Sequence, residues 1–491
     1  MHPLSRRRLF QLSGGLALAA AAPSALAQAS TADLRGDIAI LRHAWETMHP
    51  GLYRYNTPAQ MAERFAQLEA AWTAPGSFQD RLLALTRITA AVRCGHTFPS
   101  PYNSTDATVA QMYPARALVP FRFRWIGGAM VVTRDDSAEQ VFPRGAGITA
   151  VNGTPTEALL AALIPLARAD GGNDGKRISL MEMRGEDRFE TFDIHLPLVL
   201  PGLSETAAFT LADGRIVHTG LLTLAERRAA MAPATDPAAD ANPWTLEQDA
   251  DGIARLTMPG WALYNSDFAW EAWLGQAMDD LTGDGARGLI IDLRGNEGGL
   301  DCGGLILSRL LDRDLALPGD QRWTRYRRAP EALHPHLDTW DRSFLDWGGQ
   351  AVGPDERGLY RLTRYDDSAE AGTVLRPQGR RFRGSVVVLC DASNSSATFQ
   401  FARTIKDNGL ATLLGQTTGG NRRGFNGGAF FFLRLPASGF EVDLPLIASL
   451  PATPQPDAGI EPDIAVATTA RDIAEGRDPQ MAAATARILA A

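Results

Sequence analysis

The chain has 491 residues and is 45% hydrophobic, which is enough for two or three packed domains. Its formal net charge is −8 and the sequence has no basic patch, so nucleic acid is not an expected partner. No GxxxxGKS loop occurs, and no nucleotide cofactor is expected. The three cysteines lack CxxC or Cys/His spacing, so the sequence predicts no metal site; they are Cys94, Cys302 and Cys390.

The first 27 residues predict a twin-arginine export signal. S-R-R-R-L-F at 5–10 precedes a mildly apolar stretch rich in Ala and Gly, which ends in A-L-A before Gln28. We therefore expect a periplasmic or extracellular protein. No other segment approaches the ~18 consecutive apolar residues of a membrane span, so stable membrane insertion is not expected.

Four segments follow this leader. Residues 28–114 repeat apolar positions at intervals of three and four and predict helices. Residues 115–228 change to short strands with turn residues, and 229–245, rich in Ala, Pro and Asp, read as a linker. Residues 246–491 alternate strand and helix patterns and predict an α/β core, with an insertion at about 329–378. The sequence thus predicts a multidomain protein of the α/β (α+β) class.

Two strand-to-loop segments of the core have the strongest chemical pattern. S-V-V-V-L-C-D-A-S-N-S-S-A at 385–397 is a buried-type strand that ends in serines at the start of an amphipathic helix. G-L-I-I-D-L-R-G-N-E-G-G at 288–299 is a second buried-type strand, followed by a glycine pair. On their own, the serines could equally be ordinary helix N-caps, and the glycines an ordinary turn.

Together with G-Q-T-T-G-G-N at 415–421 and G-I-E-P-D-I at 459–464, these segments resemble the tail-specific or C-terminal processing protease family. The four motifs occur in the family's order. The resemblance implies a core of the ClpP/crotonase-like type and a nucleophilic serine followed by alanine, which is Ser396 here. It also implies that 115–228 is a divergent PDZ-like module, which binds an extended peptide at a sheet edge.

The resemblance implies a histidine as the general base. The best-known branch has a lysine where this chain has Asn421, and the only lysines are Lys176 and Lys406. Another branch, resembling the tricorn protease core, takes a histidine from well before the nucleophile, and R-C-G-H-T at 93–97 offers His96. Histidine suits proton transfer because its pKa lies near neutrality, although from sequence alone it reads more readily as a loop residue.

A histidine base needs a carboxylate to orient it, and relatives place one just before G-V/I-x-P-D. The nearest match is Asp457, with Glu461 and Asp463 as fallbacks, and all three also fit solvated turn residues. An oxyanion hole is expected from the backbone N–H groups of Ala397 and of one glycine of the pair, Gly298 or Gly299.

The sequence therefore predicts an exported serine peptidase that acts on peptides or unfolded proteins through an acyl-enzyme. Two alternatives remain on the same scaffold: a non-catalytic protein that binds peptides or apolar ligands, and an esterase or amidase for non-peptide substrates. The sequence leaves the oligomeric state open.

Overall fold

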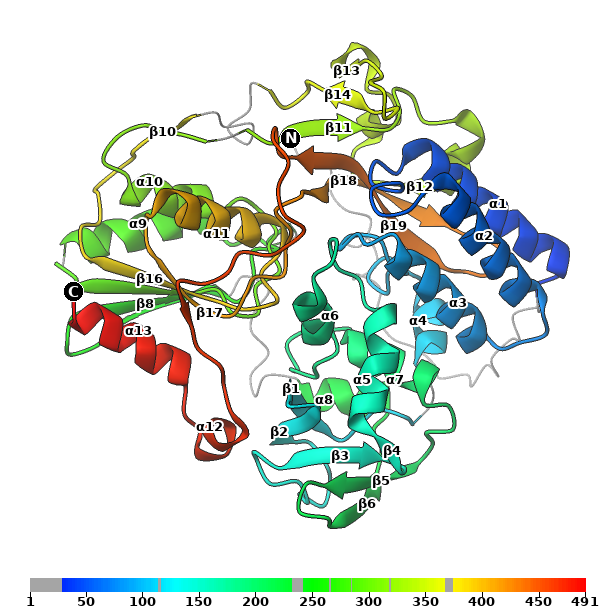
Figure 1. Cartoon of the computed structure of the whole chain (residues 1–491), viewed down its shortest axis with the longest axis horizontal. Helices are drawn as coiled ribbons and strands as arrows, with labels where there is room; N and C mark the ends of the chain where they lie inside the picture. Colours follow the sequence, from blue (N-terminus) through cyan, green and yellow to red (C-terminus); the bar gives the residue numbers. More distant parts are fainter. Residues whose placement is uncertain are drawn as a thin grey trace, which may run out of the picture.

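The structure is a computed structural model that describes residues 29–113, 116–231, 242–264, 266–283, 285–317, 319–366 and 374–491. The predicted leader and most of the predicted linker lie outside these described residues. Helices and several sheets alternate along the chain, which confirms the predicted α/β (α+β) class (Figure 1). None of the helices in the described part is long and apolar enough to cross a lipid bilayer.

A mostly parallel sheet forms the centre of the predicted core, in the order β20-β17-β16-β9-β8-β7. Its strands are β7 (Thr245–Gln248), β8 (Ile253–Thr257), β9 (Gly288–Asp292), β16 (Ser385–Cys390), β17 (Thr412–Gly415) and β20 (Ile464–Ala465). Only the pairing of β7 with β8 is antiparallel. Helices lie on both faces; they are α9 (Trp270–Gly283), α10 (Gly303–Leu310), α11 (Ser396–Asn408) and α13 (Pro479–Leu489) (Figure 1).

The continuous apolar runs of β9 and β16 follow from this two-sided burial. Ile291 and Val388 pack on the side of α9, α10 and α11, whereas Ile290 and Val387 pack on the side of α13. Because successive side chains of a strand point to opposite faces, the interior residues of such a strand are apolar on both faces. Both strands therefore end abruptly at the first polar loop.

A second sheet, in the order β12-β18-β19-β11-β14-β13, packs against the N-terminal helices. The helices are α1 (Thr31–Met48), α2 (Pro58–Thr73), α3 (Phe78–Ala91) and α4 (Asp106–Met112). The strands are β11 (Gln321–Thr324), β12 (Leu337–Asp338), β13 (Ala351–Val352), β14 (Tyr360–Leu362), β18 (Phe425–Arg434) and β19 (Glu441–Leu450). Residues 329–378, predicted as an insertion, thus contribute strands and buried side chains such as Trp347 to this shared core.

Short elements of this region connect the larger ones. They are β10 (Leu315–Ala316), which pairs with β15 (Val374–Leu375), and the 3-10 turns η3 (Glu331–His336), η4 (Arg342–Leu345) and η5 (Gly348–Gln350). After β20, α12 (Ala470–Glu475) precedes α13.

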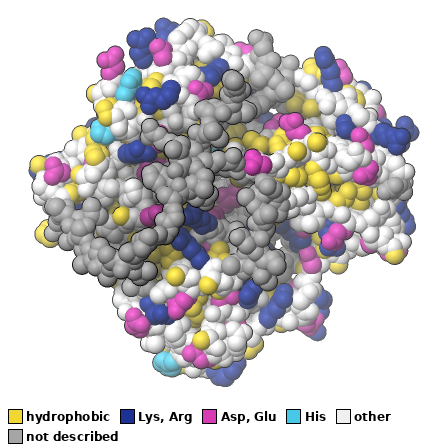
Figure 2. Space-filling view, turned by 180° about the vertical axis from the view of Figure 1, so that it is seen from behind, with side chains coloured by type: hydrophobic (Ala, Val, Ile, Leu, Met, Phe, Trp, Pro, Cys, Tyr) yellow, Lys and Arg dark blue, Asp and Glu magenta, His cyan; other side chains and the backbone are white. Residues whose placement is uncertain are grey.

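The β-rich segment forms a third sheet with its own hydrophobic core. Its strands are β1 (Phe121–Ile126), β2 (Ala129–Asp135), β3 (Gly147–Val151), β4 (Thr154–Pro155), β5 (Thr206–Leu211) and β6 (Ile216–Gly220). Its helical elements are α5 (Thr156–Leu163), η2 (Ile164–Leu166), α6 (Asp174–Leu180), α7 (Thr191–Val199) and α8 (Leu224–Met231). The PDZ-like character of this segment stays a prediction. Figure 2 shows basic and acidic side chains interspersed over the visible face of the molecule.

The loop that follows α3 is fixed to the second sheet. Pro99 forms a bridge with Val442 of β19, and the Ser100 N–H donates to the Glu441 carbonyl at 2.9 Å. The Asp443 N–H donates to the Phe98 carbonyl at 3.1 Å. Because β19 holds this loop as an added strand, the segment just after His96 has a defined position.

Two acids of β19 make the stability of this attachment depend on pH. Burial raises the pKa of Glu441 to about 7, against the pull of Arg434, and burial together with Glu441 raises the pKa of Asp443 to about 7. The folded protein therefore keeps protons that the unfolded chain releases near pH 4. Stability from these protons is complete below that pH and is lost as the pH rises through about 7.

We therefore expect the free energy of unfolding of the wild type to fall between pH 4.5 and pH 8. This fall should exceed that of the Glu441→Gln/Asp443→Asn variant by on the order of 1–3 kcal/mol. Denaturant unfolding at the two pH values measures this difference. Identical pH dependence in the two proteins would show that the acids are not buried as described.

Candidate active site

The turn between β16 and α11 holds Ser396 in an unusual backbone conformation. Its φ is +52°, a left-handed value that costs a non-glycine residue energy and is typical of functional turns. Ser395 occupies the N-cap position of α11 but makes no capping hydrogen bond; its hydroxyl donates to the Glu297 carbonyl at 3.2 Å. The serines are therefore not conventional N-caps. Among the described residues, the Ser396 hydroxyl has no hydrogen-bond partner.

The glycine pair after β9 lies directly against this turn. A Cβ on Gly298, whose φ is +98°, would lie 2.7 Å from the Ser395 carbonyl oxygen and 2.9 Å from the Ala397 nitrogen. A Cβ on Gly299 would lie 2.2 Å from the Trp261 backbone. Both positions thus require glycine for close packing, and the loop reaches the backbone at Ser396 as expected from the sequence.

The backbone N–H groups of this loop differ in their hydrogen bonding. The Gly298 N–H donates to Asn296 Oδ1 at 2.9 Å, and the buried Asn296 side chain is held in turn by the Met258 carbonyl. Within the described residues, neither the Gly299 N–H nor the Ala397 N–H has a partner. Gly299 and Ala397 are therefore the donors left free for a substrate oxygen.

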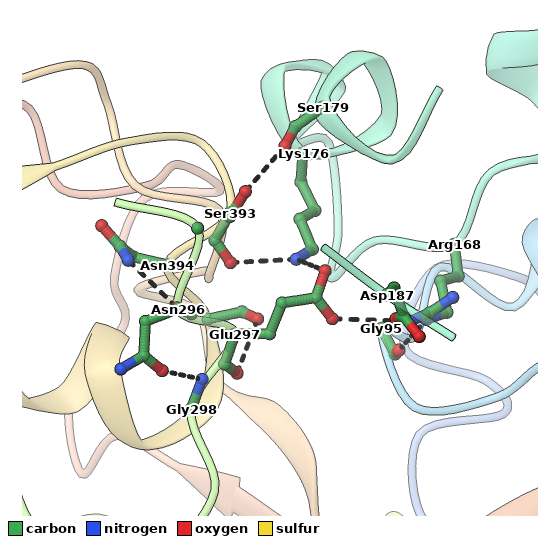
Figure 3. A network of polar contacts seen from close by, with 12 residues as sticks. Gly95, Arg168, Lys176, Ser179, Asp187, Asn296, Glu297, Gly298, Ser393 and Asn394 are labelled. Carbon is green, nitrogen blue, oxygen red and sulfur yellow. Dashed lines mark hydrogen bonds and ion pairs between the residues drawn. The ribbon is translucent and has the colours of Figure 1, made fainter. Parts of the chain in front are cut away.

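A polar network joins the nucleophile turn to the loop that holds His96 (Figure 3). Lys176 of α6 is buried, and its ammonium donates to Glu297 Oε1 at 2.8 Å and to the Ser393 carbonyl at 2.9 Å. Arg168 pairs with Glu297 at 3.5 Å and donates to the Gly95 carbonyl at 3.1 Å. Partial desolvation opposes the shift, but these two cations lower the pKa of the half-exposed Glu297 carboxylate to about 2.

The network explains why neither lysine serves as a base in this geometry. Burial lowers the pKa of Lys176, but its ammonium is shared between Glu297 and the Ser393 carbonyl. Lys406 pairs with Asp463, whose carboxylate also accepts from the Leu413 N–H. Both lysines of the chain are thus in ion pairs, and no hydrogen bond joins either to Ser396.

His96 lies between the second sheet and the β-rich segment. Its ring centroid is 5.8 Å from that of Phe430 and 6.3 Å from that of Phe425. Nδ1 is buried and has no hydrogen-bond partner. Burial lowers the pKa of His96, while the nearby Asp170 carboxylate opposes that shift. No hydrogen bond joins His96 to Ser396 in the structure.

The carboxylate beside His96 belongs to Asp170, a residue that sequence reasoning missed. Asp170 is 3% exposed, and its Oδ1 accepts from the Gly95 N–H at 3.0 Å. One oxygen of Asp170 and one nitrogen of His96 lie within 4.8 Å of each other. Asp170 precedes G-G at 171–172, but nothing in that local sequence connects it to a histidine 74 residues earlier.

Asp457, the predicted orienting acid, makes its hydrogen bonds elsewhere. Its carboxylate accepts from the Gly172 N–H at 3.0 Å, from Asn421 Nδ2 at 2.5 Å and from the Tyr55 hydroxyl at 3.4 Å. Asn421 Nδ2 also donates to the Asp170 carbonyl at 3.1 Å. Asp457 and Asn421 therefore support the backbone around Asp170, and among the described residues Asp457 makes no hydrogen bond to His96.

The two fallback acids have no such connection either. Asp463 is the partner of Lys406, as described above, and Glu461 is exposed at the surface. Among Asp170, Asp457 and these two fallbacks, Asp170 is the acid that the structure places beside the histidine.

Comparison with known proteins agrees with this architecture. Residues 252–466 match the model of peptidase family S41, whereas none of the curated proteins matches the chain. Mature CPAF complexed with lactacystin is similar in structure, with 16% identity and a TM-score of 0.59 over 91% of this chain and 95% of that one. A second structure of mature CPAF has 15% identity and a TM-score of 0.59 over 90% of this chain and 94% of that one. The photosystem II D1 C-terminal processing protease has 15% identity and a TM-score of 0.42 over 88% of this chain and 93% of that one.

At these identities the likeness to CPAF establishes the fold over nearly the whole of both chains. The family match spans the glycine pair and Ser396, but it begins after the segments that hold His96 and Asp170.

Proposed function

We propose that this chain is an exported serine-type peptidase that cleaves peptide bonds through an acyl-enzyme on Ser396; the match of residues 252–466 to peptidase family S41 supports this proposal. Peptides or proteins are the substrates that this family implies. The export part of the proposal depends on residues 1–27, and the residue roles depend on the geometry described above.

In the proposed reaction, Ser396 Oγ attacks the carbonyl carbon of the peptide bond while its proton passes to His96. The negative charge on the former carbonyl oxygen is stabilised by the N–H groups of Ala397 and Gly299. His96 then returns the proton to the leaving amine, and the C–N bond breaks. Water attacks the acyl-enzyme by the same route and regenerates the Ser396 hydroxyl.

We assign Asp170 as the group that positions His96. A carboxylate beside the imidazole ring favours one tautomer and stabilises the imidazolium that forms during the reaction. The ring nitrogen that does not face Asp170 is then the one that accepts the proton of Ser396. Asp457 acts one step further away, because its bond to Asn421 holds the backbone carbonyl of Asp170.

The observation that supports this proposal most is the backbone conformation of Ser396 together with its unbonded hydroxyl. A serine in a strained left-handed turn, with an unbonded hydroxyl and free N–H donors nearby, has no evident structural use. The Arg168 and Glu297 contacts connect this turn to the His96 loop, so both halves of the site belong to one network (Figure 3).

The isosteric pair Asp170→Asn and Asp457→Asn tests the assignment. We expect Asp170→Asn to lower kcat on a peptide substrate by about 10²–10⁴, because an amide cannot stabilise the imidazolium. Asp457→Asn should cost less than about tenfold. The reverse order, with Asp457→Asn the more damaging change, would return the orienting role to Asp457.

A further inference from the structure

Three side chains of metal-ligating type meet beside the proposed active site. Cys94, His96 and Asp170 each offer one ligand atom, and these atoms all lie within 4.8 Å of one another. Cys94 is 1% exposed and Asp170 3% exposed, so neither is an ordinary surface group. Independently of this clustering, His96 Nδ1 is a buried nitrogen without a partner.

We propose that Cys94, His96 and Asp170 bind a divalent metal ion of the zinc type, and that the bound ion reversibly inhibits the peptidase. A thiolate, an imidazole and a carboxylate form a donor set that Zn²⁺ accepts. The inhibitory part rests on the proposed function, because it follows from the role of His96 as the base.

The geometry requires only a small adjustment. In a tetrahedral zinc site with bonds of about 2.0–2.3 Å, ligand atoms lie roughly 3.3–3.8 Å apart, so the three groups must approach one another by about 1.5 Å at most. Cys94 and His96 are two residues apart on one loop, and Asp170 is already joined to that loop through Gly95. The thiol proton leaves to solvent as the metal–sulfur bond forms, and water completes the coordination.

The surroundings supply the contacts that stabilise such ligands. The Gly95 N–H donates to one oxygen of Asp170, which leaves the other oxygen for the metal. Asn426 Nδ2 lies 3.2 Å from the Cys94 sulfur, and the His96 N–H lies 3.4 Å from it. Donors directed at a thiolate stabilise its negative charge, and contacts of this kind orient metal ligands.

Inhibition follows from competition for one side chain. A histidine that coordinates Zn²⁺ gives its lone pair to the metal and has lost Asp170 as its orienting partner. It can neither reach the correct tautomer nor be stabilised as an imidazolium during proton transfer. Removal of the ion restores both, so the inhibition should be reversed by a chelator.

Metal binding is tested first on the Ser396→Ala protein, which needs no activity. Equilibrium dialysis with Zn²⁺ should give one ion per chain, and Co²⁺ should produce a thiolate-to-cobalt charge-transfer band. Replacing Cys94 by Ser should weaken Zn²⁺ binding at least tenfold and remove that band, whereas Cys302→Ser, the matched control at a buried cysteine outside the cluster, should change neither. Absence of binding, or equal loss in both variants, would overturn the site.

Inhibition is tested on the active chain, with each protein compared with itself before and after the addition of Zn²⁺. We expect Zn²⁺ to abolish peptide turnover, EDTA to restore it, and Cys94→Ser to need at least tenfold more Zn²⁺ for half-inhibition than Cys302→Ser. Zinc that binds without inhibiting would refute the inhibitory role and leave the peptidase proposal standing. An inactive enzyme that still binds zinc through Cys94 would refute the peptidase proposal and leave the metal site.

Discussion

Replacement of Ser396 by Ala is expected to lower peptide turnover by at least about 10³ and to abolish labelling by a fluorophosphonate probe. Removal of the Oγ atom leaves no nucleophile, because the other hydroxyls at this turn are already hydrogen-bonded; Ser395 donates to the Glu297 carbonyl and Ser393 contacts Ser179. Turnover of a fluorogenic peptide and gel-based detection of the probe measure the two effects.

The matched control is Ser395→Ala, one residue away. It removes a single hydrogen bond to a backbone carbonyl and should leave most of the activity and the labelling. A Ser396→Ala protein that still cleaves peptides would exclude the serine assignment. A wild-type protein that binds peptides but reacts neither with them nor with the probe would instead be a binding protein on this scaffold.

Replacement of His96 by Ala should lower kcat by about 10²–10⁴. Without a base, the Ser396 hydroxyl keeps its proton, while the oxyanion donors at Ala397 and Gly299 remain in place and account for residual activity. Steady-state kinetics with a peptide substrate measures the change, and circular dichroism checks that the variant is folded.

His43→Ala is the control for this variant, because His43 is exposed on α1 of the same N-terminal segment. It should have the kinetics of the wild type. If His96→Ala kept full turnover, another group would have to act as the base, and the assignment of His96 to the active site would be wrong.

Much of the core could be predicted because its signals are local. The apolar runs of β9 and β16 are long and are each followed by a polar loop, so both strands and the start of α11 at Ser396 were evident from the sequence. The order of four motifs indicated the resemblance to a protease family, and residues 252–466 match the model of peptidase family S41. Motifs of this kind can be recognised from sequence because each fixes a backbone shape within a few residues.

The acid beside His96 could not be predicted in the same way. Asp170 reaches the histidine only because the β-rich segment docks beside the N-terminal helices, and its bond to the Gly95 N–H depends on that docking. Asp457 matched a family pattern, but its position in three dimensions depends on Asn421 and Gly172. A contact between two distant segments produces no pattern of apolar residues in either segment, so it cannot be predicted from the sequence of one chain.

The boundary between the α/β core and the second sheet could not be predicted from the sequence either. Residues 329–378 contain strands of only two or three residues, which are too short for an alternating pattern. The long hairpin β18–β19 was read as part of the α/β core, yet its buried face packs with the N-terminal helices through residues such as Phe431 and Val442. Deletion of 28–114 would therefore expose half of a hydrophobic core as well as remove His96.

Mass spectrometry of the probe-labelled protein tests the central claim most directly. The purified chain is treated with a fluorophosphonate and digested, and the modified residue is located by fragmentation. The account predicts one adduct per chain, on Ser396, which is lost in Ser396→Ala and strongly slowed in His96→Ala. An adduct on any other residue of a chain that cleaves peptides would contradict it.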